Sequence, residues 1–203
     1  MKPKMTSRQL NNLIVKVAIL SAIAFILQLL EFPIPLMPFF LTLDLSDLPA
    51  LIGAFSLGPI AGIAIQLVKN LLFFLAKDVT GGIGPVANFV AGSALVATAG
   101  YIYQFKKTRQ GALAGMAVGT LVMTALMAVG NYYAFIPLYE KVLNFPVNAV
   151  IGVANTANPY LNITDLRAVI VYSFVPFNIL KGVMVSAATF FVYKHISPLL
   201  HKN

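Results

Sequence analysis

Long apolar runs, separated by short polar segments, make up most of this chain. A helix that crosses a bilayer needs about 20 apolar residues. The runs predict helices at about 10–30, 48–57, 59–76, 85–105, 111–139 and 167–193. We therefore expect an all-α integral membrane protein with six transmembrane helices, forming a single domain over residues 1–203.

The connections carry signals that end helices. Three prolines bar a regular helix from the first connection, EFPIPLMPFFLTLDLSD at 31–47. Gly58 and Pro59 indicate a tight turn between the short second helix and the third. A polar connection rich in Asn and Pro, at 144–165, leads to the last helix.

Charge sorts to two sides if the N-terminus is placed in the cytoplasm. The inner segments then hold the basic residues Lys2, Lys4, Arg8, Lys106, Lys107, Arg109, Lys194 and Lys202. The outer segments hold the basic residues Lys77, Lys141 and Arg167, together with all six acidic residues. This is the positive-inside bias, so we expect both termini in the cytoplasm.

Composition narrows the class of protein. The chain is 59% hydrophobic and only 10% charged, whereas a soluble domain is about 25% charged. Its net charge of +8 does not indicate nucleic-acid binding, because the basic residues punctuate apolar runs. The sequence has no cysteine and no G-x-x-x-x-G-K-[ST] motif, which excludes a disulfide and an ATP site of the P-loop type. Because the predicted helices carry no acid, we expect neither an enzyme nor a metal site.

Lys181 lies near the middle of the last apolar run, in VPFNILKGVMVS. Asn178 lies three residues earlier, so both project from one helix face. One alternative is that the lysine snorkels to an interface. Its central position favours a polar cavity between helices, where the pair would suit a ligand with carbonyl or hydroxyl acceptors.

Asn131 lies on the fifth predicted helix at a depth that differs from that of Asn178 by only about 5 Å. An interhelical hydrogen bond is the alternative for such an asparagine. With Lys181 at a similar level, we favour one cavity in the outer half of the membrane.

The first outer loop is the natural lid of that cavity. It carries Thr42 and Asp44, which we take as candidate ligand contacts, and Asp44 could neutralise Lys181 if the loop folds inward. We interpret Asp47 as an N-cap of the second helix.

Two further polar positions allow more than one interpretation. Lys69 and Asn70 either join the polar site or stabilise helix packing. For Asn88 we favour a cap or a packing role.

Small residues recur at four-residue spacing on two helices. Such pairs let helices approach closely. Gly115 and Gly119 favour internal packing of the fifth helix. Ala18 and Ala22 form a similar pair on the first.

Several segments together resemble a known family. These are LTLDLSDLPALIGAF…GPIAG, which runs from the first loop into the third helix, LVKNLL (67–72) and FNILKG (177–182). In combination, and over essentially the whole chain, they are similar to the riboflavin-specific S components of energy-coupling factor (ECF) vitamin transporters.

The resemblance implies a function and partners. It implies a bacterial cell-membrane protein that binds riboflavin in an outward-facing pocket capped by the first loop. It also implies association with a membrane T component and two ATPases, with Ala18 and Ala22 on the docking face of the first helix. The matching ligand-binding residues are Thr42, Asp44, Asn131, Asn178 and Lys181, and no cofactor is implied.

Riboflavin fits this chemistry, because it combines an apolar tricyclic ring with ring carbonyls and a polyhydroxy chain. Phe39, Phe40, Tyr132 and Tyr133 are available for stacking on the ring. An S component for thiamine, biotin or another vitamin is the alternative within the family. A stand-alone facilitator is the alternative outside it.

Overall fold

The computed structural model describes residues 6–200, with side chains to residue 192. Its helices and strands, in chain order, are α1 (Ser7–Leu29), β1 (Phe32–Pro33), β2 (Thr42–Leu43), α2 (Asp47–Ser56), α3 (Pro59–Ala76), α4 (Ile83–Phe105), α5 (Arg109–Gly130), the π-helix η1 (Asn131–Phe135), α6 (Ile136–Leu143), α7 (Val147–Ala157), α8 (Leu166–Val169), the π-helix η2 (Ile170–Phe174) and α9 (Val175–Leu200). The side chains of Lys2, Lys4, Lys194 and Lys202 lie outside the described part.

Five helical stretches are long and apolar enough to cross a membrane. They are α1, α3, α4, the continuous stretch Arg109–Leu143 and the continuous stretch Leu166–Val192. The second predicted helix forms where expected, but α2 has ten residues and a length of about 15 Å, half the hydrocarbon thickness. The prediction of six helices that each span the bilayer is therefore not confirmed.

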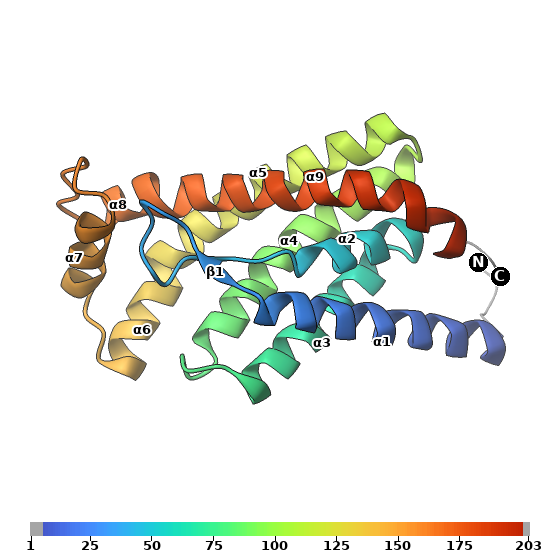
Figure 1. Cartoon of the computed structure of the whole chain (residues 1–203), viewed down its shortest axis with the longest axis horizontal. Coiled ribbons are helices and arrows are strands. Elements are labelled where there is room, and N and C mark those ends of the chain that lie inside the picture. The colour runs from blue at the N-terminus through green and yellow to red at the C-terminus, as the bar shows by residue number, and fades with distance from the viewer. Residues whose placement is uncertain (1–5, 201–203) are drawn as a thin grey trace.

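The first and last long helices nevertheless have their chain-terminal ends on one side of the bundle. The start of α1 and the end of α9 lie at the same end of the molecule in Figure 1. Between α1 and α3, the extended first loop and α2 together return the chain to that end. That this end faces the cytoplasm stays a prediction from the charge pattern.

The long connection before the last helix is more ordered than the sequence indicated. We described 144–165 as a polar connection, yet it contains α7. Val150 and Ala154 are buried on one side of this helix. The connection escaped prediction because this apolar stripe is short and lies among asparagines and prolines.

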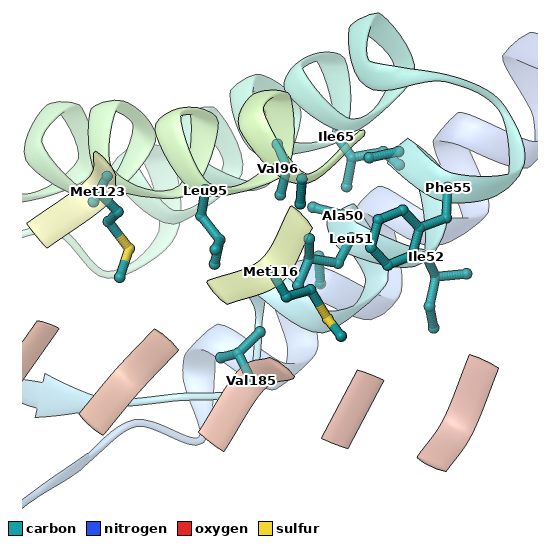
Figure 2. Packing of buried hydrophobic residues seen from close by; sticks show 14 of the residues in the cluster. Ala50, Leu51, Ile52, Phe55, Ile65, Leu95, Val96, Met116, Met123 and Val185 are labelled. Carbon is teal, nitrogen blue, oxygen red and sulfur yellow. The ribbon is translucent and has the colours of Figure 1, made fainter. Parts of the chain in front are cut away.

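A layer of apolar side chains from several helices forms the inner core. Leu51 of α2, Leu95 of α4, Met116 of α5 and Val185 of α9 belong to it, and Figure 2 shows them in one packed layer. The small α2 therefore lies inside the bundle. Eight of its ten residues are buried, and Asp47 is one of them.

The glycines of α5 allow its close approach to α4. A Cβ atom on Gly115 would lie 2.8 Å from the backbone oxygen of Ala99, and one on Gly119 would lie 2.8 Å from that of Leu95. The predicted packing role of these two glycines is confirmed.

We expect Gly115→Ala to lower the thermal midpoint of the purified protein, because the added methyl group forces α4 and α5 apart at a cost of about 1–3 kcal/mol. Gly152→Ala on α7 is the matched control, since a Cβ there meets nothing within 4 Å. It should leave the midpoint unchanged or slightly raised. Equal midpoints for the two variants would contradict the close contact.

Candidate functional site

The first loop is tied down at both of its ends. Its strands β1 and β2 pair antiparallel, with Pro33 opposite Thr42. The Thr42 hydroxyl donates to Glu31 at 2.8 Å, and the other Glu31 oxygen accepts from Lys77, after the end of α3, at 2.9 Å. Thr42, a predicted ligand contact, is therefore half-buried and engaged within the loop.

Lys181 is the point at which the loop meets the helices. Its side chain is buried, and its Nζ donates to Asp44 Oδ2 and to Asn88 Oδ1, both at 3.1 Å. The loop thus folds inward, and the predicted neutralisation of Lys181 by Asp44 is confirmed. Snorkelling to an interface is excluded by this burial.

Asp44 is held in place by its own backbone neighbourhood. Its Oδ1 accepts from the backbone N–H of Ser46 at 2.7 Å, as in an Asx turn. Because the other oxygen accepts from Lys181, the turn that starts α2 and the middle of α9 are fixed to each other.

A second buried lysine, Lys69, is linked to this contact through Asp47. Lys69 on α3 is fully buried, and its Nζ donates to Asp47 Oδ1 at 2.6 Å and to Ser46 Oγ at 2.5 Å. Asp47 Oδ2 lies 3.5 Å from Lys181 Nζ. Lys69, Asp47, Lys181 and Asp44 therefore form one buried set, which we call the charge cluster.

These contacts change two of the sequence interpretations. The interpretation of Asp47 as an N-cap was wrong, because its carboxylate pairs with lysines from α3 and α9. Asn88, for which we favoured a cap or a packing role, accepts a hydrogen bond from Lys181. Lys69, left undecided, belongs to the polar site.

The charge cluster is balanced, with two lysines and two aspartates. An unpaired charge in such surroundings costs several kcal/mol, whereas a hydrogen-bonded pair recovers most of that. Polar neighbours extend the set, because Gln66 donates to Asp47 at 2.8 Å and Gln28 of α1 donates to Asn70 of α3 at 3.2 Å.

Asn131 of η1 and Asn178 of α9 are both buried. Each donates its amide to the backbone oxygen four residues earlier, at 2.7 and 2.8 Å. Each also lies at or just beyond a π-helical stretch, η1 or η2, and such irregular turns are frequent at functional sites. No residue pattern predicted either π-helical stretch.

A second apolar cluster, which we call the outer cluster, packs the first loop against the helices. It joins Leu41 and Leu43 of the loop to Ile136, Val150 and Phe174 of the helices. Figure 1 shows the loop reaching toward α8 and the start of α9.

Only some of the aromatic residues considered for stacking lie within this outer cluster. Phe40 stacks on Phe174 with ring centroids 6.1 Å apart, and Tyr132 packs at the cluster's edge. Phe39 and Tyr133 are exposed to 66% and 75%, so they lie outside it.

The arrangement suits recognition of an uncharged amphipathic molecule. An ammonium group has three hydrogens, and Lys181 uses two of them on Asp44 and Asn88. The third makes no hydrogen bond to the described residues, although Asp47 Oδ2 lies 3.5 Å from the same nitrogen. Within the described residues, no group of three or more His, Asp or Glu side chains could hold a metal ion.

A separate apolar groove of about 540 Å³ lies between α5 and α9. Leu121, Val183 and Phe191 line it and are more than half exposed on the outside of the bundle. It lies away from the buried face of α9 that carries Lys181, so we do not assign ligand binding to it.

The five long apolar helical stretches define an integral membrane protein, and its bundle encloses a buried polar site. Residues 12–193 match the model of the family described as ECF transporter, substrate-specific component. The chain belongs to this family, and it is accordingly a multi-pass protein of the bacterial cell membrane.

Individual relatives cover nearly the whole chain. A protein of Staphylococcus aureus (strain TCH60) named riboflavin transporter RibU is 38% identical over 96% of this chain and 95% of its own. Riboflavin transporter FmnP of Bacillus subtilis (strain 168) is 31% identical over 94% of each chain. A solved structure of the S component of a bacterial ECF transporter matches with a TM-score of 0.76 and 36% identity, over 96% of this chain and 100% of that one.

We expect Lys181→Met to destabilise the protein by about 3 kcal/mol, because the substitution leaves a buried carboxylate without its counter-ion. Adding Asp44→Asn should recover part of this loss, since Lys69 and Asp47 then balance each other. Thermal unfolding of the purified variants measures both effects.

The exposed pair of Lys77 and Glu31 is the matched control. Lys77→Met should cost less than about 1 kcal/mol, and adding Glu31→Gln should recover nothing measurable. If Asp44→Asn instead adds its own full loss to that of Lys181→Met, the two groups are not an energetic pair.

Proposed function

We propose that this chain is the riboflavin-binding subunit of an ATP-driven ECF uptake transporter. It captures the vitamin from the outer side of the membrane and delivers it together with a T component and two ATPase subunits. The observation that carries the proposal is the buried Lys181, held under the first loop with one donor unused, in a chain whose relatives are named riboflavin transporters.

The outer cluster and the polar residues beside it support this ligand. The tricyclic flavin ring requires flat apolar walls, which Phe40, Phe174 and their neighbours in the outer cluster offer. The ring carbonyls and the ribityl hydroxyls require a few placed polar groups. Asn131, Asn178 and Lys181 supply these at the base of that cluster, with Thr42 and Asp44 contributing from the loop.

The charge balance also favours an uncharged ligand. Because Asp44 and Asp47 already compensate the two lysines, a bound molecule needs to bring no counter-charge. A charged vitamin such as thiamine would add an unpaired charge to a buried set.

The first helix has the exposure expected of a docking surface. Ala18 and Ala22 both lie on its exposed side, whereas Leu20, Ser21, Ala24 and Gln28 face the bundle. Only 11% of its most apolar stretch is buried within the chain, against 39–50% for the other spanning helices. Small residues on such a face permit close packing of a helix from the T component.

Titration of riboflavin into the ligand-stripped, purified protein should quench flavin fluorescence with one site per chain. Lys181→Ala and Asn131→Ala should each weaken binding about tenfold or more, because each removes a polar group from a dry pocket. Lys141→Ala is the matched control, since Lys141 is an exposed lysine of α6. Absence of quenching by a folded wild-type protein would reject riboflavin and direct the titration to other vitamins.

Replacing Ala18 and Ala22 with leucine should abolish riboflavin uptake by cells that contain the T component and the ATPases. Bulky side chains prevent the close helix contact, whereas the pocket lies elsewhere. Binding by the isolated variant should therefore match that of wild type. The same exchange at Ile19 and Ile23, which are also exposed on α1 but lie off the stripe of Ala18 and Ala22, should spare uptake. Normal uptake by the alanine variant would show that docking uses another surface, and uptake by this chain in ATP-free vesicles would indicate a facilitator.

A further inference from the structure

Lys69 is a fully buried lysine that the proposed ligand contacts do not include. It shares one face of α3 with Gln66, Asn70 and Phe73, all of them buried. Its hydrogen bonds run to Ser46 and Asp47 at the start of α2. Among the described residues, it makes no hydrogen bond to the candidate ligand residues on α9. A charge held so deeply, at full desolvation cost, needs a reason beyond packing.

Asp47 connects Lys69 to Lys181. Its Oδ1 accepts from Lys69 at 2.6 Å and from Gln66 at 2.8 Å. Its Oδ2 accepts no hydrogen bond from the described residues and lies 3.5 Å from Lys181 Nζ. One oxygen is thus committed to α3, and the other attracts Lys181 without bonding it.

The Gln66 amide is itself confined. A Cβ atom on Gly92 of α4 would lie 2.4–2.5 Å from three atoms of that amide. The backbone of α4 therefore fixes Gln66, and Gln66 with Lys69 fixes the carboxylate of Asp47. The hydrogen bonds that orient Asp47 therefore come from α3.

Lys181 is placed by competition between carboxylates. It bonds Asp44 and Asn88 at 3.1 Å and stays farther from Asp47. Lys69 makes this possible, because it offsets the negative charge of Asp47. Without Lys69, Asp47 would have only Lys181 as a counter-ion, and at a few ångströms in a poorly screened interior that attraction is strong.

We propose that Lys69 is a positioning residue for vitamin binding. By neutralising Asp47 it keeps the Lys181 ammonium between Asp44 and Asn88, with its third hydrogen available to the ligand. This inference rests on the proposed function for the identity of the ligand. The coupling between Lys69 and Lys181 through Asp47 stands without it.

The first experiment measures riboflavin affinity of Lys69→Met, in which a side chain of similar length lacks the charge. Binding should weaken about tenfold or more, as Lys181 is drawn to Asp47. At saturating riboflavin, the absorption spectrum of the bound flavin should resemble that of the Lys181→Ala complex. Adding Asp47→Asn removes the competing carboxylate and should restore affinity to within about threefold of wild type.

Gly115→Ala is the control for a purely structural effect. It destabilises the α4–α5 contact without touching the charge cluster, so its affinity and flavin spectrum should be those of wild type. If Lys69→Met binds as tightly as wild type, the proposal is overturned. The proposal is also overturned if Lys69→Met binds weakly but the added Asp47→Asn restores nothing in a folded protein. Should Lys69→Met not fold, Lys69→Gln carries the same expectations.

A double-mutant cycle, measured without ligand, separates failure of this inference from failure of the riboflavin assignment. Thermal midpoints are compared for wild type, Lys69→Met, Lys181→Met and the double variant. The double loss should exceed the sum of the single losses, because Asp47 then has neither counter-ion, and folding of both singles but not of the double counts as the same result. Introducing Asp47→Asn should abolish the excess. Additive losses would overturn the coupling, even if wild type binds no riboflavin.

Discussion

The structure depends on the pairing of charges inside an apolar bundle. Two lysines, from α3 and α9, face two aspartates at the start of α2, and all four are buried. Neither the lysines nor the aspartates can be buried there alone, because each buried ion costs several kcal/mol without a partner of opposite charge. The cluster therefore determines where α2 lies, and through Asp44 it determines where the first loop ends.

This constraint also fixes the course of the first loop. The loop enters beside Glu31, pairs its two short strands, and leaves through Asp44 into α2. Its polar end is bonded to the charge cluster, and its apolar middle packs on the outer cluster around Phe174. The first loop thus joins a polar region to an apolar one, and the proposed binding of a vitamin with a flat ring and a polyhydroxy chain makes use of both.

Much of this arrangement was predictable from residue patterns. Hydropathy placed α3 at 59–76, as observed, and the glycine spacing correctly indicated close packing of α5. The central position of Lys181 indicated that it needs a counter-ion, and Asp44 was predicted to neutralise it if the first loop folds inward, as the structure confirms. The predicted ligand contacts remain predictions, because a contact with an absent ligand leaves no mark on hydropathy or spacing.

The contacts of Asp47, Lys69 and Asn88 with Lys181 could not be predicted from the sequence, for a physical reason. Each has an ordinary local explanation, as a cap or a packing residue, and only the tertiary fold brings them to Lys181. The charge count offered one indication. Lys69 and Lys181 both lie within apolar runs and require two carboxylates, and Asp44 and Asp47 lie close together between the first and second helices. The π-helical turns next to Asn131 and Asn178 carry no residue signature of that kind.

The balance of the charge cluster bears on how membrane voltage acts on this protein. Moving one elementary charge through the membrane potential involves about 2.3 kcal/mol per 100 mV. Two positive and two negative groups within bonding distance of one another move as a set with no net charge. Voltage therefore does no net work on the charge cluster when it shifts within the bilayer, and an uncharged vitamin adds none. The two lysines can thus lie deep in the bundle without coupling the movement of this region to the membrane potential.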